Sequence, residues 1–529
     1  MGKKGRVLLI TPNLKGFKHG INRIQPPLGP MIAANIIRNK YDHEVFIHDC
    51  ALENWGRKIY ADSNVEGTVI YGQSNEEIAE TIERIDPDVV GISSLFTNLV
   101  SSAHNVARIS KKVRPKVPVI LGGNQFTNAV SDYLYAIDLE NGRTNIPQKI
   151  IDLEDQNIDY MMWGEVDNEH AQLADALIQG RDVSKIPGLV MRKGNESGNG
   201  LEYIINERPQ IPKKLSDHVP RPARDLVNME GYFERGMFHS PRSKSSRVLS
   251  VMCSRGCPEL CTFCTTPGIW GATVRWRDTE DIMAEIWEGV NNYKIGEIQF
   301  EDDTLTANNK KLMELCKELE KVGLPWCTPN GTKLDYHQKK ENGKYVTGGN
   351  QLEMYKAMAA SGCYQISLAC ESGVQRVIDE IFHKKLDVDA MKVAVENARR
   401  AGISPHTFWI VGSPGETYEE IEQTVKYAEE VGSDSCTISI CNPFPGTPIY
   451  RQVMRENLWW PGRDLKDCIL RNSLIRVDGF SSPEEFEKYV GDNLERLKNK
   501  LGERNSELFQ RHYGENVRER VKDVYLHQS

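Results

Sequence analysis

The chain has 529 residues, of which 39% are hydrophobic and 26% are charged, with 42 Gly and 25 Pro. This composition is typical of folded globular domains and excludes a single small module, a collagen-like chain and a low-complexity chain. The 66 Lys and Arg residues against 74 Asp and Glu give a net charge of −8, which argues against a nucleic-acid partner because a polyphosphate requires a basic surface.

Residues 1–206 alternate short apolar runs with stretches of helical periodicity. Five runs predict buried parallel strands, at residues 6–12, 44–50, 88–94, 118–124 and 159–165. Helices are predicted between them, at residues 29–39, 75–85, 98–113 and 167–178. This order predicts an α/β domain with a doubly wound, Rossmann-like parallel sheet. Residues 139–157 resemble a polar insertion, and residues 186–209 an appended hairpin that turns at residues 194–198.

Residues 207–246 are rich in Pro, Arg, Lys and Ser and predict a surface linker, which could also cover an active site. A second alternation fills residues 247–457. Its strands are predicted at residues 247–252, 296–301, 326–332, 364–371, 406–412 and 435–441, and helices follow most of them. Six β/α units predict a partial (β/α)6 barrel with function at the carboxyl ends of its strands. Residues 458–529 predict a charged, helical C-terminal region.

Four of the twelve cysteines lie within twelve positions, at residues 253, 257, 261 and 264. We expect a cytoplasmic protein without membrane contact because no apolar run of about 18 residues is present, and crowded thiols in that reducing compartment usually bind metal. Cys257-x3-Cys261-x2-Cys264 directly follows the first barrel strand. Three thiolates can bind three irons of a [4Fe-4S] cluster and leave the fourth iron open. The alternative is a zinc site or a fully ligated cluster that uses Cys253 as its fourth ligand.

This spacing, with Phe263 before the last cysteine, resembles the signature of the radical S-adenosylmethionine (radical SAM) family. In that family SAM binds the open iron, and the cysteine loop follows the first strand of a partial barrel. The resemblance implies further SAM contacts at later strand ends: Glu301, Asp302 and Asp303 at the amino group, Glu371 at the ribose, and Gly412, Ser413 and Glu416 near the adenosyl group. Each alone is a weak signal, because an acidic residue at a strand end more often caps a loop.

A doubly wound domain before such a barrel resembles the cobalamin-binding subgroup of the family. The residues that support this resemblance cluster at carboxyl strand ends: Pro26, Pro27, Leu28, Gly29, Asp49, Ser93, Ser94, Gly122, Gly123, Asn124, Gln125, Gly164 and Glu165. Glycines there would let a wide tetrapyrrole approach the backbone. The Asp-x-His-x-x-Gly motif of better-known cobalamin modules is absent, so no axial imidazole is expected from it, and a domain that serves only as a scaffold is the alternative.

The two resemblances together imply radical methylation. One SAM would supply the methyl group to cobalamin, and a second, cleaved at the open iron, would yield the 5′-deoxyadenosyl radical that activates the substrate. Barrel segments such as CTFCTTPGIWG look closest to the methyltransferases of phosphonate and phosphinate antibiotic pathways. This implies a small anionic substrate that is methylated on an unactivated carbon or on a P–H phosphorus, and an external electron donor of the flavodoxin or ferredoxin type. Arginines 221, 224, 275 and 277 and Trp270 are candidate anion contacts.

Other functions remain open at this point. A related enzyme could catalyse cyclisation or rearrangement without methyl transfer, and an iron-sulfur carrier or cobalamin sensor would not cleave SAM. An RNA-modifying enzyme is less favoured because the chain is acidic. A methylthiotransferase would need a second cysteine cluster, but Cys50 is the only cysteine in the N-terminal domain.

Overall fold

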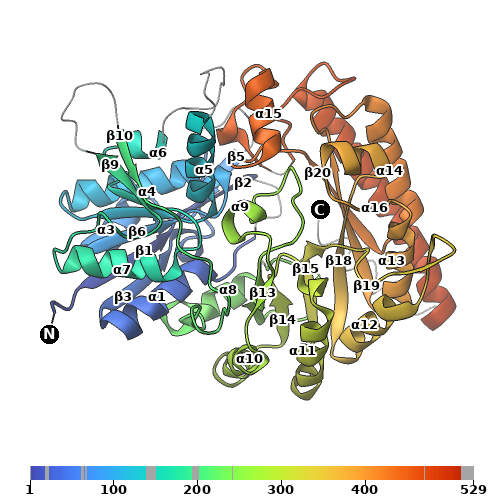
Figure 1. Ribbon diagram of the computed structural model, residues 1–529, viewed down its shortest axis with the longest axis horizontal. Helices are drawn as coiled ribbons and strands as arrows, with labels where there is room; N and C mark the ends of the chain where they lie inside the picture. Colours follow the sequence, from blue (N-terminus) through green and yellow to red (C-terminus); the bar gives the residue numbers. More distant parts are fainter. Residues whose placement is uncertain are drawn as a thin grey trace. The chain divides into compact units, whose positions relative to one another are not determined.

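The computed structural model describes residues 2–17, 23–60, 65, 68–138, 151–193, 202–236, 238–240, 242–469 and 471–513 (Figure 1). The chain forms two compact units. Unit 1 comprises Met1–Asp303 and Asn442–Ile469, and unit 2 comprises Thr304–Cys441 and Leu470–Ser529. None of the helices in the described ranges combines the length and the apolar character needed to cross a membrane.

Unit 1 contains a seven-stranded sheet in the order β10-β9-β8-β7-β6-β1-β3. Its five parallel strands confirm the predicted runs, and they are β1 (Arg6–Thr11), β3 (Glu44–Asp49), β6 (Val89–Ser93), β7 (Val119–Gly122) and β8 (Tyr160–Met162). In chain order these strands lie 2-1-3-4-5 across the sheet. The direction of winding therefore reverses between β1 and β6, where doubly wound sheets open a crevice for ligands.

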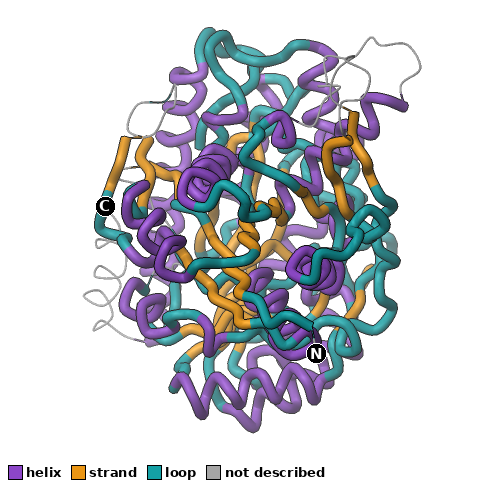
Figure 2. The backbone as a smooth tube through the Cα atoms, turned by 90° about the vertical axis from the view of Figure 1, so that its left-hand side faces the viewer, coloured by secondary structure: helices purple, strands orange, loops and turns teal. Residues whose placement is uncertain are grey.

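Helices cover both faces of this sheet (Figure 2). On one face, α3 (Asn75–Ile85), α4 (Val100–Val113) and α5 (Asn124–Asp138) pack on residues such as Leu8 and Val90. On the other face, α1 (Leu28–Tyr41) and α7 (Asp167–Ile178) pack on Val7 and Leu9. Neighbouring residues of β1 thus serve opposite faces, as the alternation of side chains along a strand requires.

Antiparallel pieces complete the N-terminal part. The predicted hairpin is present as β9 (Leu189–Lys193) and β10 (Glu202–Ile205), while its turn lies outside the described residues, as does the stretch 139–150 of the predicted insertion. A small sheet that the sequence analysis did not predict joins β2 (Leu14–Phe17), β5 (Thr68–Tyr71) and β4 (Lys58–Tyr60). Short helices α2 (Cys50–Glu53), α6 (Ile151–Glu154), η1 (Thr97–Leu99), η2 (Arg224–Leu226) and α8 (Met229–Arg235) connect these elements.

The rest of unit 1 contains the four clustered cysteines of residues 253–264. Strands β11 (Val248–Val251) and β14 (Glu297–Phe300) pair in parallel, and α10 (Thr279–Tyr293) precedes β14. Between β11 and α10 lie the two-stranded ribbon of β12 (Ser254–Arg255) with β13 (Arg275–Trp276), and the short helix α9 (Thr266–Trp270). A later segment with α15 (Pro448–Glu456) and η5 (Leu465–Asp467) also belongs to this unit. Its Ile449 amide donates to the Thr262 carbonyl, next to Cys261.

Unit 2 contains four parallel strands in chain order: β15 (Trp326–Thr332), β18 (Cys363–Glu371), β19 (Ser404–Val411) and β20 (Ser435–Ile440). Its further elements are η3 (Leu305–Ala307), α11 (Asn309–Val322), β16 (Lys339–Glu341), β17 (Lys344–Val346), α12 (Gly349–Ala360), η4 (Val377–Ile381), α13 (Ala390–Arg400) and α14 (Tyr418–Val431). The strands of both units match the six predicted for the second alternation.

The C-terminal helix α16 (Pro483–Tyr513) packs against β20 and α14 in unit 2 (Figure 1). Its residues Phe486, Val490, Leu494, Leu497 and Leu501 are all buried. These positions recur every three to four residues, so one face of the helix is a core face while the opposite face carries the charges noted in the sequence.

Candidate active site

The cysteine loop, residues 253–264, leaves the end of β11. Cys257 and Cys264 are partly exposed, whereas Cys253 and Cys261 are buried, and none of the twelve cysteines, which all lie in the described ranges, forms a disulfide. Burial raises the pKa of Cys257 to about 11, and nearby Cys264 adds to this effect. Metal binding must therefore supply the free energy of deprotonation. Within the described ranges, no group of three His, Cys, Asp or Glu side chains is arranged to hold a metal ion.

The Asp302 carboxylate holds the backbone of the cysteine loop through hydrogen bonds. Its Oδ2 accepts the Cys253 amide at 3.1 Å, and its Oδ1 accepts both the Ser254 amide and the Ser254 hydroxyl at 2.5 Å. The side chain is 2% exposed, and burial raises its pKa to about 7. Although sequence position suggested a contact with SAM, the structure places this carboxylate against the loop, where both oxygens already accept hydrogen bonds.

The side chains of Asp303 and Glu301, on either side of Asp302, contact different parts of unit 1. Asp303 accepts a 3.0 Å hydrogen bond from the Thr266 hydroxyl at the start of α9, so it also supports the region that follows the cysteines. Glu301 lies 2.7 Å from Nδ1 of His239 and is 9% exposed. His239 could not be predicted from the sequence, because nothing in the linker connects this histidine to a strand end about 60 residues later. Asp303 also accepts a backbone hydrogen bond from Gly256 in the cysteine loop, whereas the Glu301 side chain is placed against the linker by His239.

The carboxyl edge of the N-terminal sheet has room for a ligand beside β7. A Cβ atom at Gly122 would meet no heavy atom within 4 Å, whereas one at Gly123 would lie 2.3 Å from the Ser94 carbonyl oxygen. Gly123 has φ +108°, a conformation that favours glycine. Leu95 and Phe96, which follow the predicted pair Ser93 and Ser94, are 46% and 57% exposed. Large apolar side chains exposed together commonly mark a surface that a ligand covers.

Several predicted edge residues have structural partners instead. Asp49 caps α2 through the Ala51 and Leu52 amides and accepts the Tyr232 hydroxyl at 2.7 Å. The Gln125 side chain, on the first turn of α5 next to Asn124, accepts the Thr97 hydroxyl at 2.6 Å.

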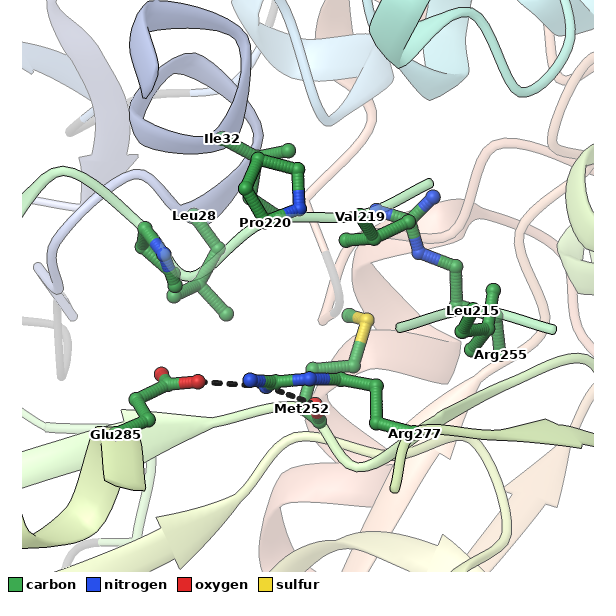
Figure 3. Close-up of a pocket in the computed structure, with 10 residues that line it drawn as sticks. Leu28, Ile32, Leu215, Val219, Pro220, Met252, Arg255, Arg277 and Glu285 are labelled. Carbon is green, nitrogen blue, oxygen red and sulfur yellow. Dashed lines mark hydrogen bonds and ion pairs between the residues drawn. The ribbon is translucent and has the colours of Figure 1, made fainter. Parts of the chain in front are cut away.

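The remaining predicted residues of this edge lie at its two ends. Of Pro26, Pro27, Leu28 and Gly29, Pro26 is buried and Gly29 exposed, and Leu28 faces a small cavity beneath the linker with Ile32 and Met252 (Figure 3). Gly164, with φ +94°, and Glu165 follow β8. Glu165 forms ion pairs with Arg255 and Arg275.

In unit 2, Glu371 ends β18 and pairs with Lys384. The Lys384 Nζ lies 2.5 Å from the Glu371 carboxylate, and both side chains are buried. Glu371 has φ +66°, and the strand pairing is irregular beside it. A glutamate is strained in this conformation, and such strain is concentrated at functional sites. The sequence analysis missed Lys384, which lies 13 residues further along the chain.

The predicted segment after β19 forms a tight turn around a buried carboxyl group. The amides of Gly412 and Ser413 donate to Oε2 of Glu416 at 2.8 and 3.0 Å. Oε1 of Glu416 is buried without a hydrogen-bond partner among the described residues, and burial raises the pKa of this group to about 7. Gly412 has φ +79°, and a Cβ there would lie 2.5 Å from the Phe486 ring. Glu416 therefore shapes the turn and keeps one oxygen for a further contact.

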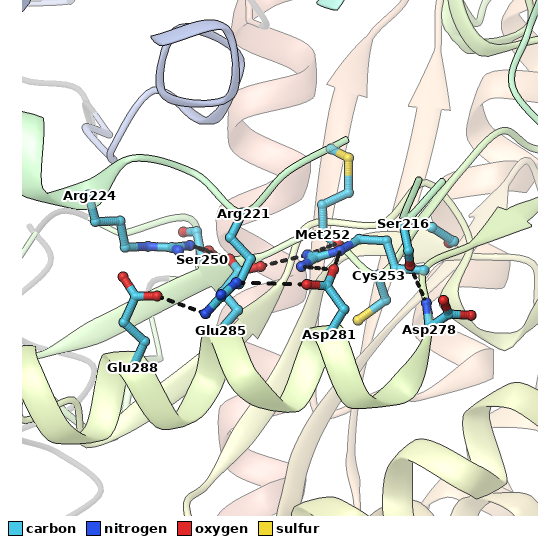
Figure 4. A network of polar contacts seen from close by, with 12 residues as sticks. Ser216, Arg221, Arg224, Ser250, Met252, Cys253, Asp278, Asp281, Glu285 and Glu288 are labelled. Atoms are coloured by element: carbon cyan, nitrogen blue, oxygen red, sulfur yellow. Dashed lines mark hydrogen bonds and ion pairs between the residues drawn. The ribbon is translucent and has the colours of Figure 1, made fainter. Parts of the chain in front are cut away.

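Three of the arginines that were candidate anion contacts, Arg221, Arg224 and Arg277, pair with carboxylates on α10, and Figure 4 shows Arg221 and Arg224 beside this helix. Buried Glu285 on α10 binds both Arg224 and Arg277 at 2.6 Å. These two guanidinium groups also donate to the carbonyls of Ser250 and Met252, and so fix the end of β11. Arg221 pairs with Glu288 at 3.2 Å. Asp281 binds Arg277 at 2.7 Å and supplies the third carboxylate, so the network holds the linker on unit 1 and leaves no net positive charge for an anion.

Arg208 is a cation of unit 1 that the sequence analysis did not single out. Its guanidinium group stacks on Trp163, 4.7 Å from the ring centre, and donates to the Gly268 carbonyl of α9. Burial lowers its pKa, and among the described residues it has no ion pair with a carboxylate. Its Nε atom is buried without a partner there. A desolvated cation without a counter-ion is suited to bind an anion.

Comparison with known proteins agrees with this geometry. Residues 251–428 match the family model described as the radical SAM superfamily, and residues 21–143 match the B12 binding domain. The cytidylyl-2-hydroxyethylphosphonate methyltransferase of Streptomyces wedmorensis is 31% identical over 501 residues, which cover 91% of this chain and 88% of that protein. The chain belongs to the family of cobalamin-dependent radical SAM methyltransferases. An uncharacterized methyltransferase of Pyrococcus horikoshii is 26% identical over 85% of this chain and 83% of its own.

Solved structures confirm the predicted fold of the enzyme. The cobalamin-dependent SAM radical enzyme OxsB, with aqua-cobalamin and SAM bound, matches 99% of this chain and 78% of its own with a TM-score of 0.64 at 13% identity. The radical SAM methyltransferase TsrM from Kitasatospora setae, with cobalamin and a [4Fe-4S] cluster bound, matches 84% of this chain and 77% of its own with a TM-score of 0.61 at 16% identity. The Rossmann-like domain, the radical SAM core and the helical C-terminus are therefore as expected.

The enzyme uses a [4Fe-4S] cluster, SAM and cobalamin. The described residues fit these groups: three thiols share one supported loop, a buried carboxyl oxygen of Glu416 lacks a partner, and open space lies beside Gly122 with exposed Leu95 and Phe96 nearby.

Proposed function

We propose that the enzyme methylates a small anionic substrate of the phosphonate or phosphinate class, on an unactivated carbon or on a P–H phosphorus. The observation that carries this proposal is the 31% identity, over 91% of the chain, to a methyltransferase of cytidylyl-2-hydroxyethylphosphonate. Cyclisation without methyl transfer has weaker support. The anaerobic magnesium-protoporphyrin IX monomethyl ester cyclase of Cereibacter sphaeroides is 26% identical over 72% of this chain and only 55% of its own length.

The proposal gives each site residue a role. Cys257, Cys261 and Cys264 bind three irons of the cluster, and Phe263 flanks the last of them. Glu301 accepts a hydrogen bond from the SAM amino group, Glu371 binds the ribose hydroxyls, and the turn of Gly412, Ser413 and Glu416 lies near the adenosyl group. When bound, the cluster supplies the electron that cleaves SAM, and cobalamin carries the methyl group.

The chain's own contribution is binding, orientation and charge. Asp302 and Asp303 support the cysteine loop, so the thiols are presented on an ordered backbone. Residues 1–206 bind cobalamin at the sheet edge of Ser93, Ser94 and Gly122 to Gln125, and residues 247–457 bind the cluster and SAM. Because the sheet reverses its winding between β1 and β6, this edge lies next to the crevice that such folds offer to ligands.

Arg208 is the residue that we propose for the anionic group of the substrate. It lies between Trp163, at the end of β8, and α9, which follows the cysteine loop. Its guanidinium group has no carboxylate partner in the described part of the chain, unlike the arginines of the α10 network. A charge-assisted bond from such a cation contributes about 1.5–3 kcal/mol. The proposal also includes a cytoplasmic location and a flavodoxin-type or ferredoxin-type electron donor.

The test is anaerobic reconstitution with iron, sulfide and hydroxocobalamin, followed by reduction and addition of SAM with cytidylyl-2-hydroxyethylphosphonate as the probe. We expect 5′-deoxyadenosine, S-adenosylhomocysteine and a probe that has gained one CH2 unit, all measured by mass spectrometry. Cytidine monophosphate serves as a control without the phosphonate. The variant C261A should form none of these products, while C316A, which removes a buried thiol of unit 2, should retain them. Formation of 5′-deoxyadenosine without methylation of any phosphonate tested would favour the cyclisation alternative.

A further inference from the structure

The end of β8 and the cysteine loop are joined by a buried cluster of charged side chains. We propose that Glu165 is a positioning residue that fixes the cysteine loop to the N-terminal sheet, rather than a contact for cobalamin. The part of this inference that concerns methyl transfer rests on the proposed function. The part that concerns the order of the loop stands without it.

Glu165 lies directly after Gly164 at the end of β8 and binds two arginines at once. Its Oε1 accepts hydrogen bonds from Nη1 of Arg255 at 2.8 Å and from Nη1 of Arg275 at 3.2 Å, and its Oε2 accepts one from Nη2 of Arg275 at 2.7 Å. All three side chains are at least nine-tenths buried. Both carboxylate oxygens are therefore used by the ribbon that carries the cysteine loop.

The two arginines sit opposite each other. Arg255 on β12 and Arg275 on β13 are directly paired across the antiparallel ribbon. Like charges in this arrangement repel each other, most strongly where water is excluded. Glu165 lies between the two guanidinium groups, so its charge allows the ribbon to close. Asp167, on the first turn of α7, binds Arg255 at 2.6 Å and neutralises the second positive charge.

Further contacts give this cluster a single geometry. Arg255 stacks on the Trp270 ring at 4.5 Å, and Arg275 donates to the carbonyls of Trp270 and Pro212. Planar guanidinium groups held by several acceptors have little rotational freedom. Arg255 lies two residues before Cys257, the first proposed cluster ligand. The side chain of Glu165 therefore fixes the position of Cys257 relative to the end of β8.

This connection matters for a reaction that uses two bound groups. The bound cluster would supply the radical on the barrel side and bound cobalamin would supply the methyl group at the sheet edge, so a substrate would have to reach both in one geometry. The carboxylate of Glu165 comes from the element at the sheet edge, and its two partners come from the element that bears the cysteines. Loss of this carboxylate should make the position of the cysteine loop relative to the sheet edge more variable. It should have a smaller effect on the binding of the cluster or of cobalamin alone.

The first experiment measures hydrogen exchange of the reconstituted holoenzyme with the variant E165Q. We expect amides of residues 254–264 to exchange at least about tenfold faster, while amides of the N-terminal core strands exchange at the wild-type rate. The matched control is E230Q, because Glu230 pairs with Arg247 on the same unit but is 62% exposed. Unchanged exchange in the cysteine loop of E165Q would overturn the inference, and so would faster exchange spread evenly over unit 1.

The second experiment measures the ratio of methylated product to 5′-deoxyadenosine. With cytidylyl-2-hydroxyethylphosphonate as probe, the ratio of methylated product to 5′-deoxyadenosine should fall at least about tenfold in E165Q, because the radical forms but no longer meets the methyl group. A merely structural role would lower both products in the same proportion and would refute the inference. R275K keeps the charge but loses the planar fork, and it replaces E165Q if that variant does not fold. If the wild type does not methylate the probe, the proposed function fails, while hydrogen exchange still decides the role of Glu165.

Discussion

Asp302→Ala tests whether this carboxylate supports the cysteine loop or serves SAM. In the structure it accepts the amides of Cys253 and Ser254 and the hydroxyl of Ser254. Each buried amide left without an acceptor costs about 1–3 kcal/mol, so the two amides cost about 2–6 kcal/mol. The substitution should therefore disorder the loop that presents Cys257.

The cost depends on pH because burial raises the pKa of Asp302 to about 7, from its ordinary value of 3.8. Between these two values the folded chain holds a proton that the unfolded chain has lost, so the stability of the wild type falls as the pH rises. Asp302→Ala has no such group. The advantage of the wild type over the variant should therefore shrink by about 3 kcal/mol between about pH 5 and about pH 8.

The first assay is urea unfolding of the apo chain at both pH values, monitored by tryptophan fluorescence. The second assay measures the iron content of the chain after reconstitution. We expect the variant to bind about half of the wild-type iron or less. Asp217→Ala is the control, because this aspartate forms an exposed pair with Lys214. Wild-type iron content and a wild-type unfolding midpoint at both pH values, combined with weaker SAM binding, would refute the argument and return Asp302 to the SAM site.

Four further predictions follow from other residues. C253A should retain wild-type iron content, because its buried thiol lies outside the Cys-x3-Cys-x2-Cys spacing; an iron assay that shows loss of the cluster would make Cys253 a ligand. Burial lowers the pKa of His170 to about 4, below its ordinary 6.5, so the wild type should lose about 3 kcal/mol as the pH falls through this window and H170N should not, as measured by urea unfolding. K384M leaves Glu371 buried without its cation and should destabilise unit 2 by about 3–5 kcal/mol, a cost that the double variant with E371Q largely removes in the same assay. R208Q should raise KM for the phosphonate probe about 10-fold to 100-fold with little change in kcat, and an unchanged KM would exclude Arg208 from anion binding.

Structural features that depend on residues close together in the sequence could be predicted from it. The five parallel strands of the N-terminal sheet and all six strands of the second alternation were found, because a buried parallel strand is a short run of consecutive apolar residues. The hairpin of β9 and β10 was also correct. The cysteine spacing identified the radical SAM family because the three cysteines of this motif lie in one loop, so the motif needs no residue from a distant part of the chain. The small sheet of β2, β5 and β4 was missed, since β2 and β4 are antiparallel strands that contain Lys15 and Lys58 and lack a continuous apolar run.

The partners of charged residues could not be predicted. The place of Glu165 at a strand end predicts a cobalamin contact, whereas the structure pairs this residue with Arg275, which lies 110 residues away in the sequence. Arg277 was read as an anion contact, yet Glu285 on α10 neutralises it. The position of an acidic or basic residue at a strand end shows only that it is near the site. Whether it faces a ligand or a buried counter-charge depends on what packs against it.

The sequence by itself determined the fold family and the order of the elements, because apolar periodicity and cysteine spacing are local properties of the chain. The tertiary structure decided which carboxylates support the cysteine loop, that Arg208 has no carboxylate partner among the described residues, and where residues 442–469 return to unit 1. The physical reason is that desolvation makes an unpaired buried charge costly. Each such group is therefore held by a partner that only long-range packing brings near.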